Sequence, residues 1–281
     1  MRSTRSRVAA LTICLCTANH LAAAQQPDTT PSADRFARVA QLLDRLRQPT
    51  STFDPPSIAR YMRIRDGVTE EILAEVDAFV TERFIPGQTD EAHVRADMDA
   101  LLHHLPEISL EATSAFLVTL TTGRYLVVGI DIPRIGDGPD DAMWLRAYRD
   151  DGGQFVRVAA AEFAQDRRRG PGNDGSLMSL QLTGLEPLSA ARFWFVATAS
   201  RRQGALATVV LRIGRFDGER FTAVAAAPDI FPSVSPTVRS LSDGGFTIQR
   251  RASRYGKGII ERYAMTEQGP IKVDEWDADS R

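Results

Sequence analysis

The chain has 281 residues, with 34 Lys and Arg against 36 Asp and Glu. A chain of this length buries a substantial core without disulfide bonds, and its slightly acidic balance argues against nucleic acid as the main partner. No apolar run after residue 24 approaches the length that crosses a bilayer, so we expect a soluble protein with no membrane-spanning segment in the mature chain.

The first 24 residues have the three parts of a Sec-type export signal. Three arginines give a positive start, an apolar stretch runs from Val8 to Cys16, and three alanines that end at Ala24 offer a cleavage site. We therefore expect cleavage after Ala24 and a periplasmic or secreted protein. Both cysteines lie in this signal, so the mature chain would have no disulfide or thiolate site. Its formal net charge would be −5, because three arginines and no acid are removed from a chain of charge −2.

A helical part is expected at residues 33–108, after a flexible lead-in at 25–32. Apolar residues recur there every three or four positions, as on one face of a helix. We expect the Asp66–Gly67 pair to end a short helix and Thr69 to begin the next one. The expected helices cover residues 36–46, 57–64, 69–85 and 90–105.

Residues 109–281 are predicted to form antiparallel strands, because short runs rich in β-branched and aromatic residues alternate there with Gly, Asp and Pro. A similar order of strands and turns recurs three times, and each recurrence suits a four-stranded meander. In the second unit, Gly184 is expected to end the first strand. The sequence therefore predicts an α+β fold, in which an N-terminal helical segment is followed by an antiparallel β meander of about three four-stranded units.

The packing of these units is left open by the sequence. A partial propeller or an open curved sheet fits the repeated order, and a β-sandwich is the alternative. Strand alternation places Phe193 and Phe195 on one face and Trp194 on the other. One face would belong to the core, and an outward Trp194 would mark a contact surface against the N-terminal helices.

Arginine is concentrated in the loops after the second and fourth strands of each predicted unit. In a meander these loops share one end of the sheet, and the tight turns with Asp150, Asp151, Asp217 and Glu219 share the other, so we expect one basic and one acidic end. Clustered arginines bind carboxylate, phosphate or sulfate groups. The candidate anion-binding residues are Arg134, Arg167, Arg168, Arg169, Arg201, Arg202, Arg254 and Lys257.

A metal site is a second candidate. His93 and Asp97 are one helical turn apart, and His104 returns to the same side of that helix. Histidine and carboxylate ligands on one face can hold a zinc-type ion, whereas a solvated surface pair explains the same spacing. The candidate metal ligands are therefore His93, Asp97 and His104.

Catalytic motifs are missing from the sequence. It has no Gly-x-Ser-x-Gly elbow, no EF-hand loop and no Gly-rich phosphate loop. Glu162, Glu186 and Glu261 could serve as acids in a paired-carboxylate hydrolase, but their spacing does not pair them. We expect no cofactor, and whether the chain is an enzyme stays open at this point.

These observations favour an exported, non-catalytic binding or interaction module that recognises an anionic small molecule, glycan or protein through its Arg-rich loops. Two other classes stay open. One is a hydrolase with a metal or paired-carboxylate site at the helix–sheet junction, and the other is a carrier of apolar cargo with a helical lid over a curved sheet.

Overall fold

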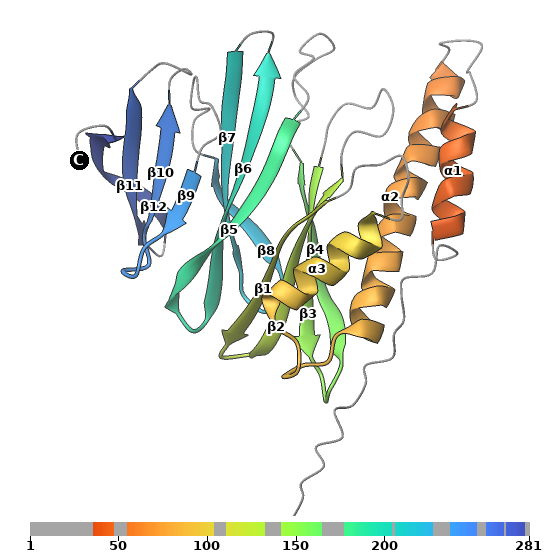
Figure 1. The fold of residues 1–281 in the computed structure, drawn as a ribbon, viewed down its shortest axis with the longest axis horizontal. Coiled ribbons are helices and arrows are strands. Elements are labelled where there is room, and N and C mark those ends of the chain that lie inside the picture. The colour runs from red at the N-terminus through yellow and green to blue at the C-terminus, as the bar shows by residue number, and fades with distance from the viewer. Residues whose placement is uncertain are drawn as a thin grey trace, which may run out of the picture.

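The computed structural model describes residues 36–47, 55–103, 111–132, 142–164, 177–203, 206–226, 237–251, 257–266 and 268–278. In these ranges three helices are followed by twelve strands (Figure 1). None of the described helices has both the length and the hydropathy to cross a membrane. The predicted export signal and lead-in lie outside the described residues.

The helical part differs from the sequence prediction at Gly67. The helices are α1 (Ala37–Arg47), α2 (Pro55–Arg83) and α3 (Glu91–Leu102). The predicted break at Asp66–Gly67 is wrong, because α2 runs through it as one helix of 29 residues. A Cβ added at Gly67 would lie 3.9 Å from Leu42 Cδ1 of α1. Packing of α1 against α2, in which Leu42 and Val68 are buried, thus offsets the poor helix propensity of glycine.

The strands form three four-stranded sheets. Sheet 1 contains β1 (Glu111–Leu120), β2 (Gly123–Ile132), β3 (Ala142–Asp150) and β4 (Phe155–Ala164). Sheet 2 contains β5 (Leu177–Ser189), β6 (Arg192–Gln203), β7 (Leu206–Phe216) and β8 (Phe221–Ala226). Sheet 3 contains β9 (Thr237–Ser240), β10 (Phe246–Arg251), β11 (Gly258–Thr266) and β12 (Gly269–Asp277). Strands adjacent in sequence are adjacent in each sheet and antiparallel, so the prediction of three four-stranded meanders is confirmed.

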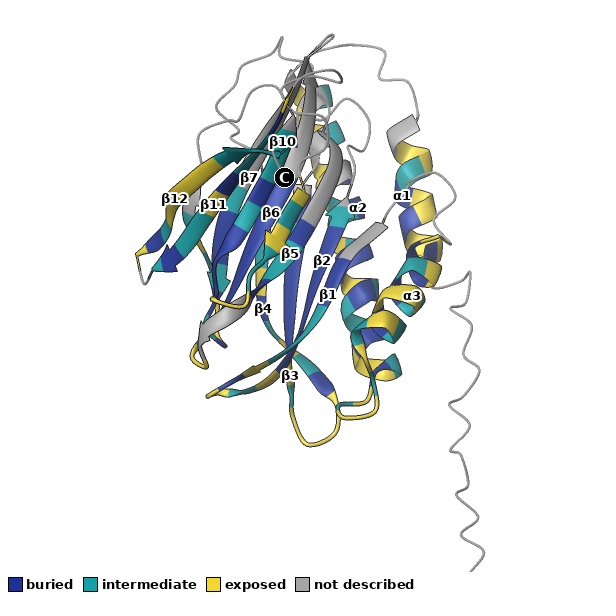
Figure 2. Cartoon of the chain, turned by 60° about the vertical axis from the view of Figure 1, so that its left-hand side comes forward, coloured by how far each residue is buried: buried dark blue, intermediate teal, exposed yellow. Residues whose placement is uncertain are grey.

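The sheets stack in chain order behind the helical layer (Figures 1 and 2). Strand β1 contacts β5, and β5 contacts β9; on the other side, β4 contacts β8 and β8 contacts β12. Helices α2 and α3 cover sheet 1. Apolar cores lie between the helices and sheet 1, between sheets 1 and 2, and between sheets 2 and 3. Each sheet therefore has a front face toward the preceding layer and a back face away from it.

All three sheets carry a β-bulge between their third and fourth strands. In each one the register shift leaves a single valine of the fourth strand without a partner residue: Val158, Val224 and Val273. Val158 packs against the core between sheets 1 and 2, and Val224 packs against the core between sheets 2 and 3. Val273 is 53% exposed, since no described layer lies behind sheet 3. The bulge and its valine thus recur as a structural feature of each unit.

Gly184 has a different role from the one predicted, because β5 continues to Ser189. A Cβ added at Gly184 would lie 3.0 Å from the Phe116 ring of sheet 1 and 3.1 Å from the Phe193 ring. Glycine therefore permits a close approach between sheets 1 and 2 at this point and does not end the strand.

Trp194 faces away from Phe193 and Phe195, as alternation predicts, but it does not reach the helices. Phe193 and Phe195 belong to the core with sheet 1, and Trp194 belongs to the core with sheet 3. All three are buried. The predicted contact between Trp194 and the N-terminal helices is therefore wrong, because two sheets separate them.

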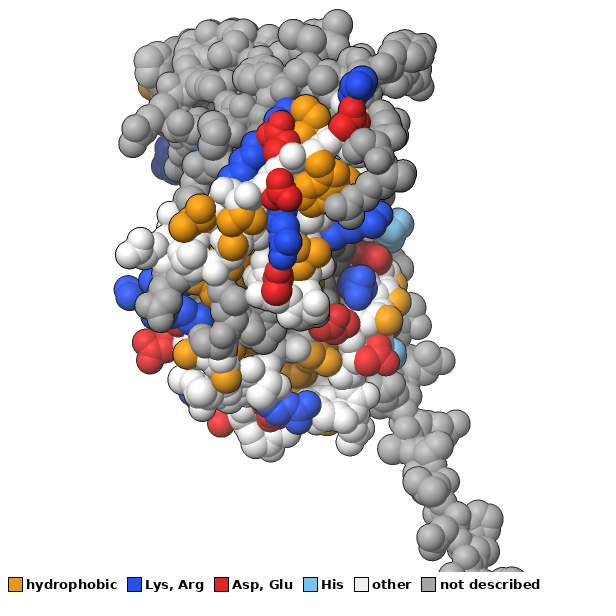
Figure 3. All heavy atoms as spheres, turned by 90° about the vertical axis from the view of Figure 1, so that its left-hand side faces the viewer, with side chains coloured by type: hydrophobic (Ala, Val, Ile, Leu, Met, Phe, Trp, Pro, Cys, Tyr) orange, Lys and Arg blue, Asp and Glu red, His pale blue; other side chains and the backbone are white. Residues whose placement is uncertain are grey.

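The back face of sheet 3 is suited to solvent (Figure 3). In sheet 1, the third-strand residue just before the bulge is Ala147, and its cross-strand pair with Val127 is buried. The equivalent pair in sheet 3 is Thr247–Arg262, which is polar. Charged and apolar side chains are interleaved on this face in Figure 3. The outermost layer of a stacked array needs polar residues on its outer face, because no further layer covers that face.

Candidate functional site

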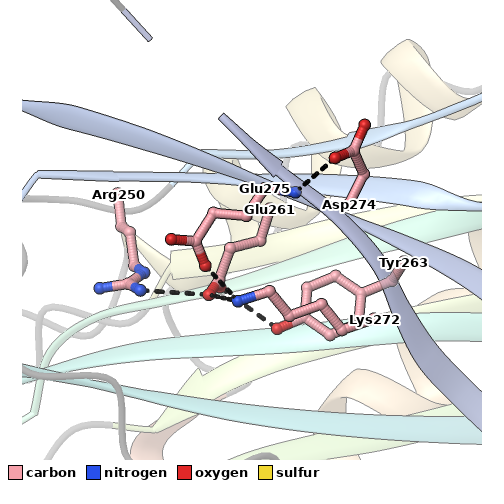
Figure 4. A network of polar contacts seen from close by, with 6 residues as sticks. All are labelled: Arg250, Glu261, Tyr263, Lys272, Asp274 and Glu275. Carbon is pink, nitrogen blue, oxygen red and sulfur yellow. Dashed lines mark hydrogen bonds and ion pairs between the residues drawn. The ribbon is translucent and has the colours of Figure 1, made fainter. Parts of the chain in front are cut away.

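A buried carboxylate, Glu261 of β11, is the centre of a polar network in sheet 3 (Figure 4). Only 5% of this residue is exposed. Its Oε1 accepts hydrogen bonds from Arg250 Nη2 at 3.1 Å and from Lys272 Nζ at 2.7 Å. Its Oε2 accepts one from the Tyr263 hydroxyl at 3.2 Å. The carboxylate thus joins β10 and β12 to the strand between them.

Strand register brings these side chains together on the front face of sheet 3. Glu261 is paired with the buried Ile248 of β10, and Arg250 follows Ile248 by two positions, so all three share that face. Tyr263 follows Glu261 by two positions and is paired with Lys272 of β12. The network therefore lies on the same face as the core between sheets 2 and 3.

Electrostatics fix the protonation states of this network. Burial raises the pKa of Glu261, but hydrogen bonds from Lys272 and Arg250 outweigh burial and hold that pKa below its ordinary value. Hydrogen bonds to Glu261 and Glu275 raise the pKa of Lys272. Burial and the neighbouring Glu261 raise the pKa of Tyr263 to about 12. At neutral pH Glu261 is ionised and Lys272 is protonated, which suits a fixed ion-pair network better than proton transfer.

A second carboxylate, Asp77 of α2, joins the helical layer to sheet 1. The Tyr148 hydroxyl donates to Asp77 Oδ1 at 2.8 Å, and Arg157 Nη1 donates to Asp77 Oδ2. The buried Arg146 places its Nε 3.4 Å from Asp77 Oδ1. A further link runs from Thr81 Oγ1 to the Phe155 carbonyl at 3.1 Å. Polar contacts therefore position α2 on β3 and β4, in addition to the apolar core beneath it.

Burial shifts the pKa values of two groups beside Asp77 in opposite directions. Burial, reinforced by Asp77, raises the pKa of Tyr148 well above its ordinary value. Burial lowers the pKa of Arg146, and the charge of Asp77 opposes that effect. Tyr148 is thus a neutral hydrogen-bond donor across the physiological range, as Tyr263 is in sheet 3.

The two carboxylate sites lie at equivalent positions of two four-stranded sheets. Tyr148–Arg157 in sheet 1 and Tyr263–Lys272 in sheet 3 are both the cross-strand pair next to the bulge on its turn side. In each case a tyrosine and a cation hold one carboxylate. The carboxylate itself comes from α2 in the first site and from β11 in the second.

The predicted anion-binding residues belong to segments attached at one end of the stack, which we call the loop end. The last residues of β2, β4, β6, β8 and β10 lie there, opposite the hairpin turns at the turn end (Figure 1). Arg201 and Arg202 are in the final residues of β6, and Lys257 directly precedes β11. Lys257 Nζ lies 3.2 Å from Asp277 Oδ2, so an anion would compete with this carboxylate. The other candidates, Arg134, Arg167, Arg168, Arg169 and Arg254, lie outside the described residues.

The turn end is mixed in charge where it is described, so the expected acidic end is wrong there. Asp150 Oδ2 lies 3.8 Å from Arg124 Nη1, and Asp217 Oδ2 lies 3.7 Å from Arg220 Nε. The prediction of an acidic end considered only the acids in the turns. It did not include the nearby arginines, which the fold brings beside those acids.

His93 and Asp97 lie together on α3, as their spacing predicts, with Nε2 and Oδ2 3.2 Å apart. Arg83 Nε of α2 donates to the same oxygen at 2.8 Å. A metal ion bound to Asp97 Oδ2 would therefore compete with Arg83. His104 lies outside the described residues, and within those residues no three His, Cys, Asp or Glu side chains form a metal-binding group. The metal site stays a prediction.

The three candidate acids lie on three different sheets: Glu162 on β4, Glu186 on β5 and Glu261 on β11. Sequence reasoning named Glu261 but assigned it no partners, and it missed Asp77 entirely. A charged residue between the apolar residues of a predicted core strand was the available signal for Glu261. Asp77 offers no such signal, because acids are common on amphipathic helices.

Comparison with known proteins gives no match: no family model fits the chain, and no curated protein or solved structure is similar to it.

Proposed function

We propose that the protein is an exported binding module whose loop end recognises an anionic ligand or partner. The observation that carries this proposal is the strand order, since the described strands that lead to the predicted anion-binding residues (β2, β4, β6 and β10) all end at the loop end of three stacked sheets. Convergent arginines bind carboxylate, phosphate or sulfate groups, and adjacent segments can share one such group.

The layered scaffold supports this role. Apolar cores pack both faces of sheets 1 and 2, so the strands that lead to these segments are packed on both sides. Binding residues on loops that a rigid scaffold positions are a common arrangement in recognition modules.

The charged clusters favour binding over catalysis. Glu261 and Lys272 neutralise each other, and their pKa values move away from the neutral range that general acid–base catalysis requires. Asp77 is likewise engaged by Tyr148 and Arg157. In both places the carboxylate is used to join structural elements.

The three sheets are, in this proposal, copies of one unit arranged like the blades of a partial propeller. Support comes from the shared strand order and from the bulge valines Val158, Val224 and Val273. The front-to-back stacking in chain order agrees with such a relationship.

The test uses heparin-agarose as a sulfated polyanion, with the purified chain that begins at Gln25. We expect retention that falls as salt rises, because ionic contacts are screened. The variant R201E/R202E reverses two charges at the loop end and should elute at clearly lower salt.

The matched control is R149E/R220E, which makes the same change of charge at the turn end, and it should elute close to the unmodified protein. Equal losses in both variants would indicate adsorption by overall charge and overturn the proposal. So would an unmodified chain that passes through the column without retention. Export is tested separately: N-terminal sequencing of the secreted form should begin at Gln25.

A further inference from the structure

The tight turn between β3 and β4 contains Asp151–Gly152, where we propose that the backbone undergoes spontaneous aspartyl isomerisation. Asp precedes Gly at six places in the chain, and the structure describes four of them: Asp66, Asp151, Asp217 and Asp243. The same dipeptide therefore occurs in several environments within one molecule. Their geometry differs in the features that control this reaction.

The Asp151 turn is open. Asp151, Gly152, Gly153 and Gln154 are all exposed, and the Asp151 carboxylate has no hydrogen bond or ion pair with any described residue. Gly152 and Gly153 have φ angles of +68° and +108°, and a Cβ at either would meet nothing within 4 Å. The backbone bond from Asp151 N to the Gln154 carbonyl, 2.9 Å long, closes the hairpin without restraining the carboxylate.

The reaction needs only these groups and water. The Gly152 amide nitrogen attacks Cγ of the Asp151 side chain, a new C–N bond forms, and one water leaves as a five-membered imide closes. Water then adds to one of the two imide carbonyls. Attack at the side-chain carbonyl restores Asp151, and attack at the backbone carbonyl leaves the chain linked through the side chain. One water is released and one is consumed, so the product is an isomer of the starting chain.

Asp217 has its carboxylate held in place within the equivalent hairpin of sheet 2. Asp217 Oδ1 accepts hydrogen bonds from the amides of Glu219 at 3.1 Å and Arg220 at 3.0 Å. Gly218 packs against Thr122 and Tyr125 of sheet 1. The carboxylate therefore points to amides beyond Gly218, and the glycine that must move is enclosed.

Asp243, in the turn between β9 and β10, is restrained in a similar way. Its Oδ1 accepts from the Gly245 amide at 3.0 Å, and its Oδ2 accepts from Arg262. Asp66 lies inside helix α2, whose hydrogen bonding restrains the backbone amides. Of these four sites, Asp151 combines an unrestrained carboxylate with an open glycine.

The experiment incubates the intact folded chain at neutral pH and physiological temperature. Digested samples are then mapped by mass spectrometry, with enzymatic methylation of isoaspartyl groups as the readout. We expect the isoaspartyl fraction to rise several-fold faster at Asp151 than at Asp217 or Asp243. A transient species lighter by one water should appear in the Asp151 peptide.

Two controls separate structure from sequence. In urea, where the turns are lost, the three rates should converge, and a persistent preference for Asp151 would overturn the structural argument. The variant D151E, which disfavours the five-membered ring, should remove the Asp151 signal and leave the other peptides unchanged. Equal rates in the folded chain, or no isomer at Asp151, would overturn the proposal.

Discussion

Tyr148 and Tyr263 occupy the same position in sheets 1 and 3, next to the bulge, and each donates its hydroxyl hydrogen to a carboxylate. The Tyr148 bond crosses from sheet to helix, whereas the Tyr263 bond stays within one strand. Because only the Tyr148 bond joins two layers, we expect removal of its hydroxyl group to lower the free energy of unfolding more than removal of the Tyr263 hydroxyl group.

The substitution Tyr148→Phe should lower the free energy of unfolding by about 1–2 kcal/mol, because it removes the hydrogen bond that the fully buried Tyr148 donates to Asp77 Oδ1. Tyr263→Phe should cost less, about 0.5 kcal/mol, since Glu261 keeps Arg250 and Lys272 as donors. Urea denaturation of both variants measures this difference. A larger loss for Tyr263→Phe would contradict the interpretation of Asp77 as a joint between layers.

Glu261→Gln should destabilise the protein by about 2 kcal/mol, because Arg250 and Lys272 then face each other without the buried negative charge between them. Glu275→Gln is its matched control. Glu275 pairs with the same lysine but its side chain is 45% exposed, so its loss should change stability by less than about 0.5 kcal/mol. Equal unfolding midpoints for the two variants would show that the buried ion pairs of Glu261 contribute no more to stability than the exposed pair of Glu275.

Acid should weaken the protein partly through Glu261. The folded-state pKa of Glu261 lies below its ordinary value of 4.5, so its contribution is fully present above that value. The contribution is lost as the pH falls from there through the folded-state pKa. Unfolding free energies at a series of acidic pH values should therefore decline less steeply in Glu261→Gln. Parallel curves for the two proteins would contradict the lowered pKa.

Gly67→Ala should stabilise the protein by about 0.5–1 kcal/mol, since alanine favours the helix and its Cβ would make an ordinary contact 3.9 Å from Leu42. Thermal denaturation measures the shift. A loss of stability would mean that the contact between α1 and α2 at Gly67 has no room for a methyl group.

Gly184→Ala is the contrasting case and should destabilise the protein by about 1–3 kcal/mol. Its Cβ would lie 3.0 Å from the Phe116 ring, so sheets 1 and 2 would have to separate slightly. The double variant Gly184→Ala/Phe116→Leu should recover part of that loss. No recovery would place the strain elsewhere than at Phe116.

The strand order of this protein was predictable because hairpins are local. Turn residues such as Asp151–Gly152 and Asp217–Gly218, with alternating apolar residues around them, indicate where each strand pair begins. The same local reasoning failed at Gly67 and Gly184. Both glycines resemble breaks in isolation, and both are retained in regular structure because another helix or sheet packs against them.

The charged clusters could not be predicted for a related reason. Asp77 is 71 positions from Tyr148 and 80 from Arg157, and no local pattern links residues so far apart.

The sequence by itself determined the hairpins, the helical and β parts, and the places where arginine is concentrated, since these depend on the chemistry of neighbouring residues. Only the tertiary structure decided which faces meet, which carboxylates are buried and which cations neutralise them. Burial and ion pairing depend on the layer that covers a side chain, and in this stack that layer comes from a distant part of the chain.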